Sequence, residues 1–353
     1  MKKIVSMILS LCMAASLAAC GAASSSQSSR SSTSESSTPE SDSRYANSAV
    51  EREKHTFRIA GMKGPTTMGM LQLMDEAEQG HPYDDYQTSV YATAQEILPL
   101  LIQGEVDVAL LPANVASTVY NQTQGKIQVA AINTLGVLYV VENGDSIQSI
   151  ADLKGKTIYS TGKGNTPEYT LNYILSQNGI DPTTNVTIEY NSEATEVAAM
   201  LAQDSGDAIA VLPQPYVTTV MAQNENLRVA LDLTEEWDKV NPDSTLVTGV
   251  LVANKEFIEN DPEAFDIFMG FYELSIEYVN EHPAEAAEWM VKYGILPNAT
   301  IAEKALPECN ITYIDAAEMK DTLSGYLQVL MDQNPASIGG AMPADDFYYY
   351  VAE

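Results

Sequence analysis

The chain has 353 residues, and its 48 acidic and 18 basic side chains give a formal net charge of −30 at pH 7. Such a negative chain repels phosphate backbones, which argues against nucleic acid as a partner. An acidic surface also keeps an exported protein soluble, so the charge does not identify a cationic ligand.

The first twenty residues, MKKIVSMILSLCMAASLAAC, have the order of a secretory signal. Two lysines precede an apolar core from Ile4 to Leu17 that is too short to span a membrane. The ending Leu-Ala-Ala-Cys, followed by Gly21, resembles a bacterial lipobox, in which the cysteine is lipidated and becomes the first mature residue. We therefore expect a signal peptide over residues 1–19 and a lipid anchor on Cys20. The alternative is an ordinary cleaved signal that releases the protein.

The next segment, residues 20–54, is expected to tether the folded part to the membrane. Most of it is Ser and Thr with scattered charges, which is too little apolar surface to offset chain entropy. Roughly 300 residues follow, enough for one large domain or two of ordinary size. Because Cys12 leaves with the signal and Cys20 carries lipid, Cys309 has no partner and we expect no internal disulfide.

From Thr56 onward, short apolar runs alternate with segments of helical period, which predicts an α/β fold with mostly parallel strands. The segments TFRIAG, YQTSVYAT and VDVALLPA are expected strands. The segments TTMGMLQLMDEAEQ, AQEILPLLIQGE and NVASTVYNQ are expected helices. After IQVAAINTLGVLYVVEN the same order restarts with KTIYSTG, TPEYTLNYILSQNG, VTIEYN, EATEVAAMLAQD, DAIAVLPQ and PYVTTVMAQN.

This restart indicates an internal repeat, because the two halves share residues at matching positions. Gln103, Asp107 and Pro112 in the first half correspond to Gln203, Asp207 and Pro213 in the second. The alternative is that any two βα units look alike. A repeat predicts two similar α/β lobes.

The segment STLVTGVLVANKEF is expected to return as a strand to the first lobe. Lobe 1 then comprises residues 55–140 plus 246–353, and lobe 2 comprises residues 141–245. Two crossover strands would join the lobes, with hinges near Val140 and Val247, a geometry suited to closing around a ligand. The long C-terminal helices are expected to be peripheral, with Met, Tyr and Phe stripes that belong to the core.

Four segments carry a family resemblance: ILPLLIQGEVDVALLPANVAS, SIADLKGKTIYST, LNYILSQNGIDPTTNVTIEY and VANKEFIENDPEAFDIF. They resemble the solute-binding proteins of ABC importers for nitrate, sulfonates, taurine and thiamine-pyrimidine precursors, over most of residues 55–290. The resemblance implies a two-lobed, periplasmic-binding-protein-like (type II) fold with a helical C-terminus. It also implies permease and ATPase partners, and a place on the outer face of the bacterial cytoplasmic membrane. Its motifs DLKGK and GEVD lie at turns and identify the fold better than the ligand.

Two strand-to-helix junctions repeat the order Lys, Gly, any residue, Thr, and we expect both to face the cleft. A helix start leaves N–H groups unpaired and carries partial positive charge, so it can hold an anionic or strongly polar group. Glycine lets the backbone approach closely, proline fits a first turn, and threonine can cap or offer a hydroxyl. The alternative is plain capping without a ligand. The candidate residues are Lys63, Gly64, Pro65, Thr66, Thr67, Lys163, Gly164, Asn165 and Thr166.

Four further candidates follow other strands, namely Tyr91, Asn114, Gln214 and Tyr216. A tyrosine ring can stack on a planar ligand while its hydroxyl bonds a polar edge. The paired helix starts and lysines favour a small organic anion such as a sulfonate or carboxylate. The alternative is a planar heterocycle such as a thiamine-pyrimidine precursor or a flavin.

Catalytic motifs are absent from the sequence, which contains no His-x-x-x-His or Cys-x-x-Cys pair, no Gly-x-Ser-x-Gly elbow and no Walker loop. His55, His81 and His282 have no metal-site spacing. We therefore expect a monomeric binding protein with no enzyme activity, cofactor or metal. An enzyme on the same fold is the alternative of another class, because relatives of the fold include a menaquinone-pathway dehydratase and a pyrimidine-precursor synthase.

Overall fold

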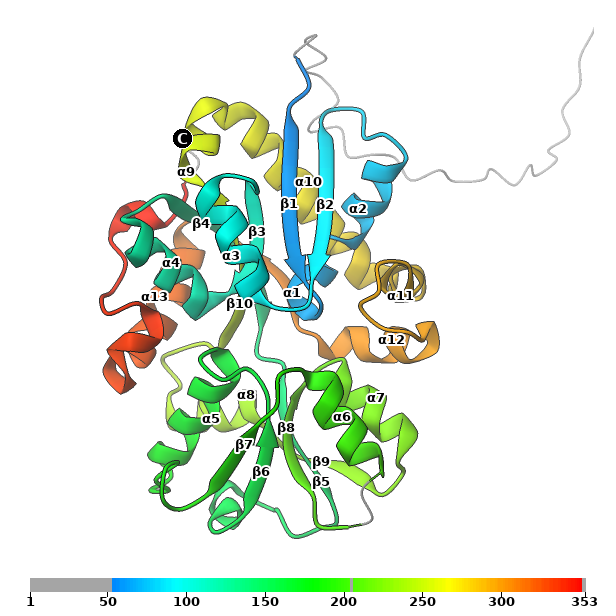
Figure 1. Ribbon diagram of the computed structural model, residues 1–353, viewed down its shortest axis with the longest axis vertical. Coiled ribbons are helices and arrows are strands. Elements are labelled where there is room, and N and C mark those ends of the chain that lie inside the picture. Colours follow the sequence, from blue (N-terminus) through cyan, green and yellow to red (C-terminus); the bar gives the residue numbers. More distant parts are fainter. Residues whose placement is uncertain (1–52, 204–205, 351–353) are drawn as a thin grey trace, which may run out of the picture. The chain divides into compact units, whose positions relative to one another are not determined.

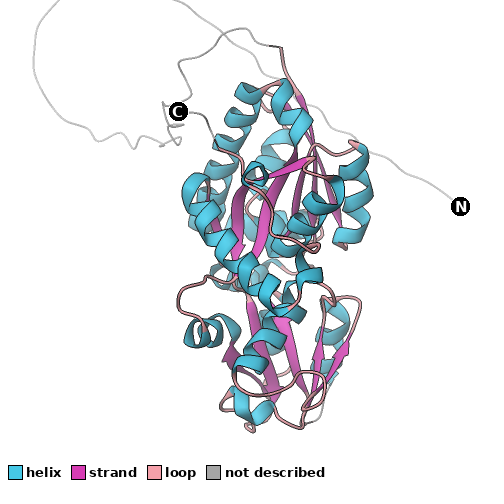
Figure 2. Ribbon diagram, turned by 90° about the vertical axis from the view of Figure 1, so that its left-hand side faces the viewer, coloured by secondary structure: helices cyan, strands magenta, loops and turns pink. Residues whose placement is uncertain are grey.

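The structure is a computed structural model, and it describes residues 53–203 and 206–350. The predicted signal peptide, the lipobox with Cys20 and most of the tether lie outside the described residues. Within the described ranges the chain forms two β-sheets, each flanked by helices (Figure 1). Figure 2 shows the strands of each sheet lying between helices. The predicted α/β, two-lobed fold is confirmed.

One sheet of the described ranges has six strands in the order β11-β4-β10-β3-β1-β2. The strands are β1 (Thr56–Met62), β2 (Asp85–Tyr91), β3 (Val108–Pro112), β4 (Ile127–Leu135), β10 (Val247–Asn254) and β11 (Ile311–Ile314). The other sheet, again within the described ranges, has the order β7-β6-β8-β5-β9. Its strands are β5 (Leu138–Asn143), β6 (Thr157–Ser160), β7 (Thr187–Tyr190), β8 (Ile209–Pro213) and β9 (Leu227–Asp232). Each sheet with its helices is called here the six-stranded lobe or the five-stranded lobe.

Helices connect most of these strands. The six-stranded lobe carries α1 (Pro65–Met68), α2 (Leu71–Glu78), α3 (Ala94–Gln103), α4 (Ala113–Thr123), α9 (Lys255–Asn260), α10 (Pro262–Glu281), α11 (Pro283–Lys292), α12 (Ala299–Ala305) and α13 (Ala316–Gln333). The five-stranded lobe carries α5 (Thr166–Gln177), α6 (Ala194–Gln203), α7 (Tyr216–Gln223) and α8 (Leu233–Val240). Short 3₁₀ helices lie at Ile150–Leu153, Leu306–Glu308, Pro335–Ile338 and Asp345–Phe347.

The internal repeat is visible in the topology of the two sheets. The neighbours β2-β1-β3 in one sheet correspond to β7-β6-β8 in the other, and both sets are parallel. In each sheet, the strand beside this parallel set comes from a crossover between the lobes. It is β10 beside β3 in one sheet and β5 beside β8 in the other, and each pairs antiparallel with that neighbour. The expectation of mostly parallel strands was therefore wrong, because the crossover strands enter each sheet from the opposite end.

Gly136 lies where the two crossovers between the lobes meet. The first crossover is the short link between β4 and β5, and the second leads from α8 into β10. A side chain on Gly136 would clash with both neighbours, since a Cβ there would lie 2.2 Å from Thr234 Oγ1 and 3.1 Å from Leu246 Cδ2. Glycine at this position leaves room for Thr234 and Leu246 beside the first crossover.

The six-stranded sheet is buried on both faces, as its apolar runs predict. Phe57, Ile59 and Leu110 face one core with α2 and α10, whereas Ala60 and Leu111 face another core with α3, α4 and α13. The apolar stripes of α10 and α13 are buried, as expected. Both helices supply fully buried side chains to the cores.

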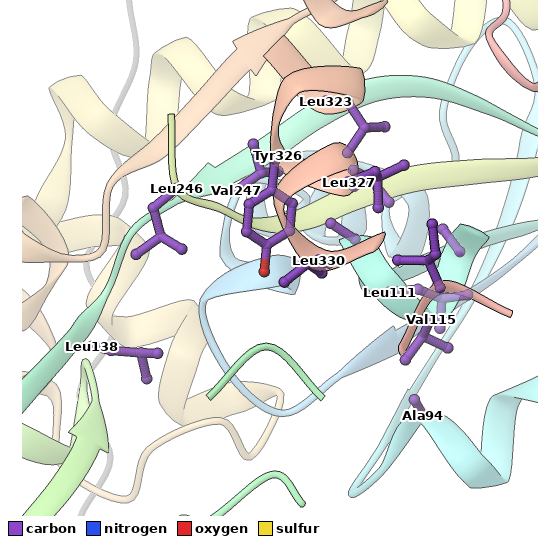
Figure 3. Close-up of a cluster of buried hydrophobic side chains, with 14 of the residues drawn as sticks. Ala94, Leu111, Val115, Leu138, Leu246, Val247, Leu323, Tyr326, Leu327 and Leu330 are labelled. Carbon is purple, nitrogen blue, oxygen red and sulfur yellow. The ribbon is translucent and has the colours of Figure 1, made fainter. Parts of the chain in front are cut away.

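One core continues from the six-stranded lobe into the five-stranded lobe. Figure 3 shows Leu138 from β5, Leu246 and Val247 from the second crossover, and Tyr326 of α13 in the same cluster. That cluster also includes Trp237 of α8 in the five-stranded lobe, whose ring centroid lies 5.6 Å from that of Tyr326. Helix α13 therefore joins the two lobes through buried apolar contacts.

The helix expected over TTMGMLQLMDEAEQ is divided into α1 and α2 at Gly69 and Met70. Ser275 of α10 causes the break, since its hydroxyl donates to Gly69 O at 2.7 Å and accepts from Leu73 N at 3.2 Å. These are the two groups that an uninterrupted helix would pair with each other.

Candidate ligand-binding cleft

A cleft of about 550 Å³ lies between the two lobes. Its walls are the turns that follow β1, β2 and β3 in the six-stranded lobe and β6, β7 and β8 in the five-stranded lobe. Ligands of open α/β sheets bind outside the carboxyl ends of parallel strands, where such turns meet. The cleft is also lined by Thr248 of β10, by Val137 and Leu138 at the first crossover, by Val291 of α11 and by the segment between α11 and α12.

Eight of the thirteen residues predicted for the site line this cleft, and five do not. The lining residues are Lys63, Gly64, Pro65, Thr66, Lys163, Asn165, Thr166 and Tyr216. Thr67, Tyr91, Asn114, Gly164 and Gln214 lie outside the lining. Ligand contact by any of these residues stays a prediction.

The junction after β1 is a tight turn. Gly64 adopts a φ of 143°, a conformation that favours glycine, and Pro65 is the first residue of α1. Thr67 points away from the cleft, and its hydroxyl donates to Met62 O at 2.6 Å. Because α1 has only four residues, it contributes far less dipole than the single long helix expected from the sequence.

The junction after β6 leads into the twelve-residue helix α5. Gly164 has a φ of 80°, and its N–H donates to Glu168 Oε2 at 2.6 Å instead of facing the cleft. Thr166 is 1% exposed and lies against the Tyr326 phenol together with Thr170. Burial raises the pKa of Tyr326 to about 12, and the two threonine hydroxyls oppose that rise. The Thr166 side chain is therefore buried at the contact between the lobes, where its hydroxyl makes no hydrogen bond within the described residues.

Asn114 connects the two lobes rather than lining the cleft. It is 1% exposed, and its Nδ2 donates to Gly164 O at 3.2 Å and to Ser337 O at 3.1 Å. The first bond joins the start of α4 to the β6–α5 turn across the lobes.

Gln214 and Tyr91 also have structural contacts. Gln214 caps α7, because its Oε1 accepts from Thr218 N at 3.2 Å and from Thr218 Oγ1 at 3.0 Å. Tyr91 packs against the core that includes α3, while its carbonyl accepts from Lys63 N at 2.9 Å.

The charged groups of the lining are two lysines and one glutamate. Lys63 and Lys163 are exposed, and Lys163 Nζ lies 5.8 Å from the ring centroid of Tyr190. Glu193 lines the cleft in front of α6. Burial raises the pKa of the Tyr216 phenol, and the charge of Glu193 adds to that rise. Tyr216 is therefore a neutral hydrogen-bonding group at physiological pH.

The predicted residues omitted Ala92–Gln95 after β2 and Val137–Leu138 in the first crossover, and they also omitted two further lining segments. The turn Asn191–Thr195 follows β7, and the rule that selected the other turns would have found it. The segment Gly294–Pro297 follows helix α11 and no strand, so no strand-end signal marks it.

Within the part of the chain that the structure describes, no three His, Cys, Asp or Glu side chains gather closely enough to hold a metal ion. In the same residues no helix is both long and apolar enough to cross a bilayer.

The model of one protein family, described as NMT1/THI5 like, matches residues 91–286, more than half of the chain. The chain belongs to the NMT1/THI5-like family. The match includes the turns after β6 and β7 and ends before Gly294–Pro297. No match was found among curated protein sequences.

Solved structures share the fold of this NMT1/THI5-like chain. An ABC transporter protein from Parabacteroides distasonis is 24% identical, with a TM-score of 0.68 over 84% of this chain and 99% of that one. The aliphatic sulphonate-binding protein SsuA from Escherichia coli is 16% identical, with a TM-score of 0.68 over 85% and 94%. The nitrate-binding protein NrtA from Synechocystis PCC 6803 is 11% identical, with a TM-score of 0.58 over 80% and 82%. The expected resemblance to solute-binding proteins is thus confirmed at the level of family and fold.

Proposed function

We propose that the chain is the solute-binding component of an ABC importer, and that its lobes close on a small molecule. The cleft of about 550 Å³ carries this proposal, because it lies between two lobes joined by two crossovers and is lined from both sides. Two structures of the same fold are named as sulphonate-binding and nitrate-binding proteins. The lobes proposed to move are residues 55–140 plus 246–353 and residues 141–245.

The size of the cleft favours an organic ligand over an inorganic ion, since organic ligands occupy pockets of about 300 to 1,000 Å³. An organic anion such as a sulfonate or carboxylate is supported by Lys63 and Lys163. A planar heterocycle is supported by Tyr216 and by apolar lining residues that include Val137 and Leu296.

A thermal-shift screen of alkanesulfonates, carboxylates, nitrate, pyrimidines and flavins tests the proposal. A ligand at about a hundred times its Kd adds roughly 2.7 kcal/mol to the free energy of unfolding. Lys63→Met with Lys163→Met should abolish the shift from an anion, and Tyr216→Ala should abolish the shift from a heterocycle. Exposed Lys126, outside the lining, provides the matched control Lys126→Met.

The screen also has outcomes against the proposal. If no compound class raises the melting temperature and a candidate substrate is turned over, the chain is an enzyme on this fold. If the ligand raises the melting temperature of the variants and of the control by the same amount, the ligand binds outside the cleft.

The N-terminal sequence supports a location for this function. We propose that Cys20 carries lipid and holds the monomer on the outer face of the bacterial cytoplasmic membrane, where a separate permease and ATPase receive the solute. Cys20→Ala should move the protein from the membrane fraction to the soluble fraction. Unchanged membrane fractionation would contradict the anchor.

A further inference from the structure

We propose that the cleft rejects anions and selects an uncharged or cationic organic ligand, because Glu96, Glu168 and Glu196 occupy the helix starts that open on it. This inference rests on the proposed solute-binding function and specifies its ligand. It reverses the ligand class that the two lysines favour in the sequence.

Each of the three glutamates is the third residue of its helix, and each accepts from an N–H group of the turn that leads into that helix. Thr93 N donates to Glu96 Oε2 at 2.9 Å, Gly164 N to Glu168 Oε2 at 2.6 Å, and Ser192 N to Glu196 Oε2 at 3.0 Å. Thr93 and Ser192 line the cleft, and Gly164 lies between two lining residues. Helices α3, α5 and α6 thus cap themselves with a carboxylate.

Prolines remove further donors from the same helix starts. Pro65 is the first residue of α1, Pro167 the second of α5, and Pro215 directly precedes α7. None of them carries a backbone N–H. In the first turn of α7, Thr218 N donates to Gln214 Oε1. Anion sites at helix starts depend on such N–H groups, so each proline leaves its helix start with one donor fewer.

The charges close to the cleft are also unfavourable to an anion. Glu193 of the lining and the three capping glutamates give four negative charges, against two positive charges from Lys63 and Lys163. Lys163 Nζ lies near the ring of Tyr190, which is not a lining residue. An uncharged ligand escapes this repulsion, and a cationic one is attracted.

The size of the repulsion decides what an experiment should detect. One glutamate charge at about 8 Å from a bound anion, in an effective dielectric of about 40, weakens the affinity for that anion by about fivefold. Three such charges would give about a hundredfold, which screening at physiological salt reduces to about fivefold. Neutralising the three glutamates should therefore raise anion affinity measurably.

The test replaces the three glutamates together, as Glu96→Gln, Glu168→Gln and Glu196→Gln. Glutamine keeps an oxygen that accepts the capping hydrogen bonds and loses only the charge. The control is Glu259→Gln, Glu281→Gln and Glu318→Gln, three exposed residues outside the lining that change the net charge by the same amount. Butanesulfonate is the probe, titrated by calorimetry at 50 and 200 mM salt.

We expect the triple variant to bind butanesulfonate about tenfold more tightly than the natural protein and the control at 50 mM salt, and about fourfold more tightly at 200 mM. The affinity for a non-anionic ligand from the screen should change less than threefold. Equal affinity in all three proteins, or butanesulfonate binding by the natural protein as tight as its best non-anionic ligand, would overturn the inference. If no compound in the screen binds the natural protein but the triple variant still binds butanesulfonate more tightly than the control does, the charge inference holds and the proposed function fails.

Discussion

Several polar residues that the sequence places at strand ends have structural partners far away in the chain. Asn114 bonds Gly164 and Ser337, which are 50 and 223 positions away. The strand-end pattern was sufficient to predict that Thr66, Thr166 and Tyr216 border a cleft. The same pattern could not predict the structural role of Asn114, because nothing in the sequence marks Gly164 or Ser337 as its hydrogen-bond partner.

His81 is a buried residue whose protonation is linked to folding. It is 4% exposed, and its ring centroid lies 4.5 Å from that of Phe271 and 4.8 Å from that of Tyr86. Burial lowers the pKa of His81 to about 4, and the charge of Asp84 opposes this decrease. Folded His81 therefore stays neutral at a pH where an unfolded histidine is protonated.

This difference predicts a loss of stability in acid. Between pH 6.5 and 4 the unfolded chain binds the proton and the folded chain does not, so His81 lowers the free energy of unfolding as the pH falls through this window. The effect is at most about 3 kcal/mol. Urea unfolding at pH 7.5 and 4.5 should show a smaller loss in His81→Gln than in the natural protein. His282→Gln, at an exposed site, is the control, and equal losses in all three proteins would refute this role.

At the scale of elements, most strands and helices follow from the apolar periods, whereas their tertiary connections do not. The buried residues Met319, Leu323, Leu327 and Leu330 of α13 have the spacing of an amphipathic helix. That stripe predicts burial but not the lobe on which the helix packs. The division between α1 and α2 was equally unpredictable, because Ser275 lies more than 200 positions away.

Tyr326 makes α13 a structural link between the lobes. It contacts Trp237 of α8, whose ring centroid lies 4.7 Å from that of Tyr173 in α5. We predict that Tyr326→Ala lowers the free energy of unfolding by about 3 to 5 kcal/mol and separates the unfolding of the lobes into two transitions. Leu330→Ala should cost about 2 to 5 kcal/mol and keep one transition.

Calorimetry of both variants distinguishes these outcomes. A single transition in Tyr326→Ala, or a loss below about 1 kcal/mol, would show that α13 does not couple the lobes. Tyr326→Phe keeps the ring and should remain close to the natural protein.

At the scale of the whole molecule, the repeat was readable from matching residues a hundred positions apart, and the two crossovers from the strand expected over STLVTGVLVANKEF. The direction of the crossover strands could not be predicted from the sequence, since it depends on the end from which β5 and β10 enter their sheets. The proposed closure is supported by two features, since the lobes meet at two crossovers around Gly136 and both contribute to the cleft. A ligand that contacts both lobes binds the closed state more tightly and shifts the population toward it.

Small-angle scattering during titration with the ligand from the screen is the most direct test of lobe closure. Ala92→Trp serves as the control, because Ala92 is exposed at the cleft and a tryptophan there fills space that the ligand needs. If the lobes close on the ligand, we expect the ligand to decrease the radius of gyration of the natural protein and to leave that of Ala92→Trp unchanged. A radius that stays constant in the natural protein while the ligand is bound, or an equal decrease in both proteins, would contradict closure of the two lobes around the cleft.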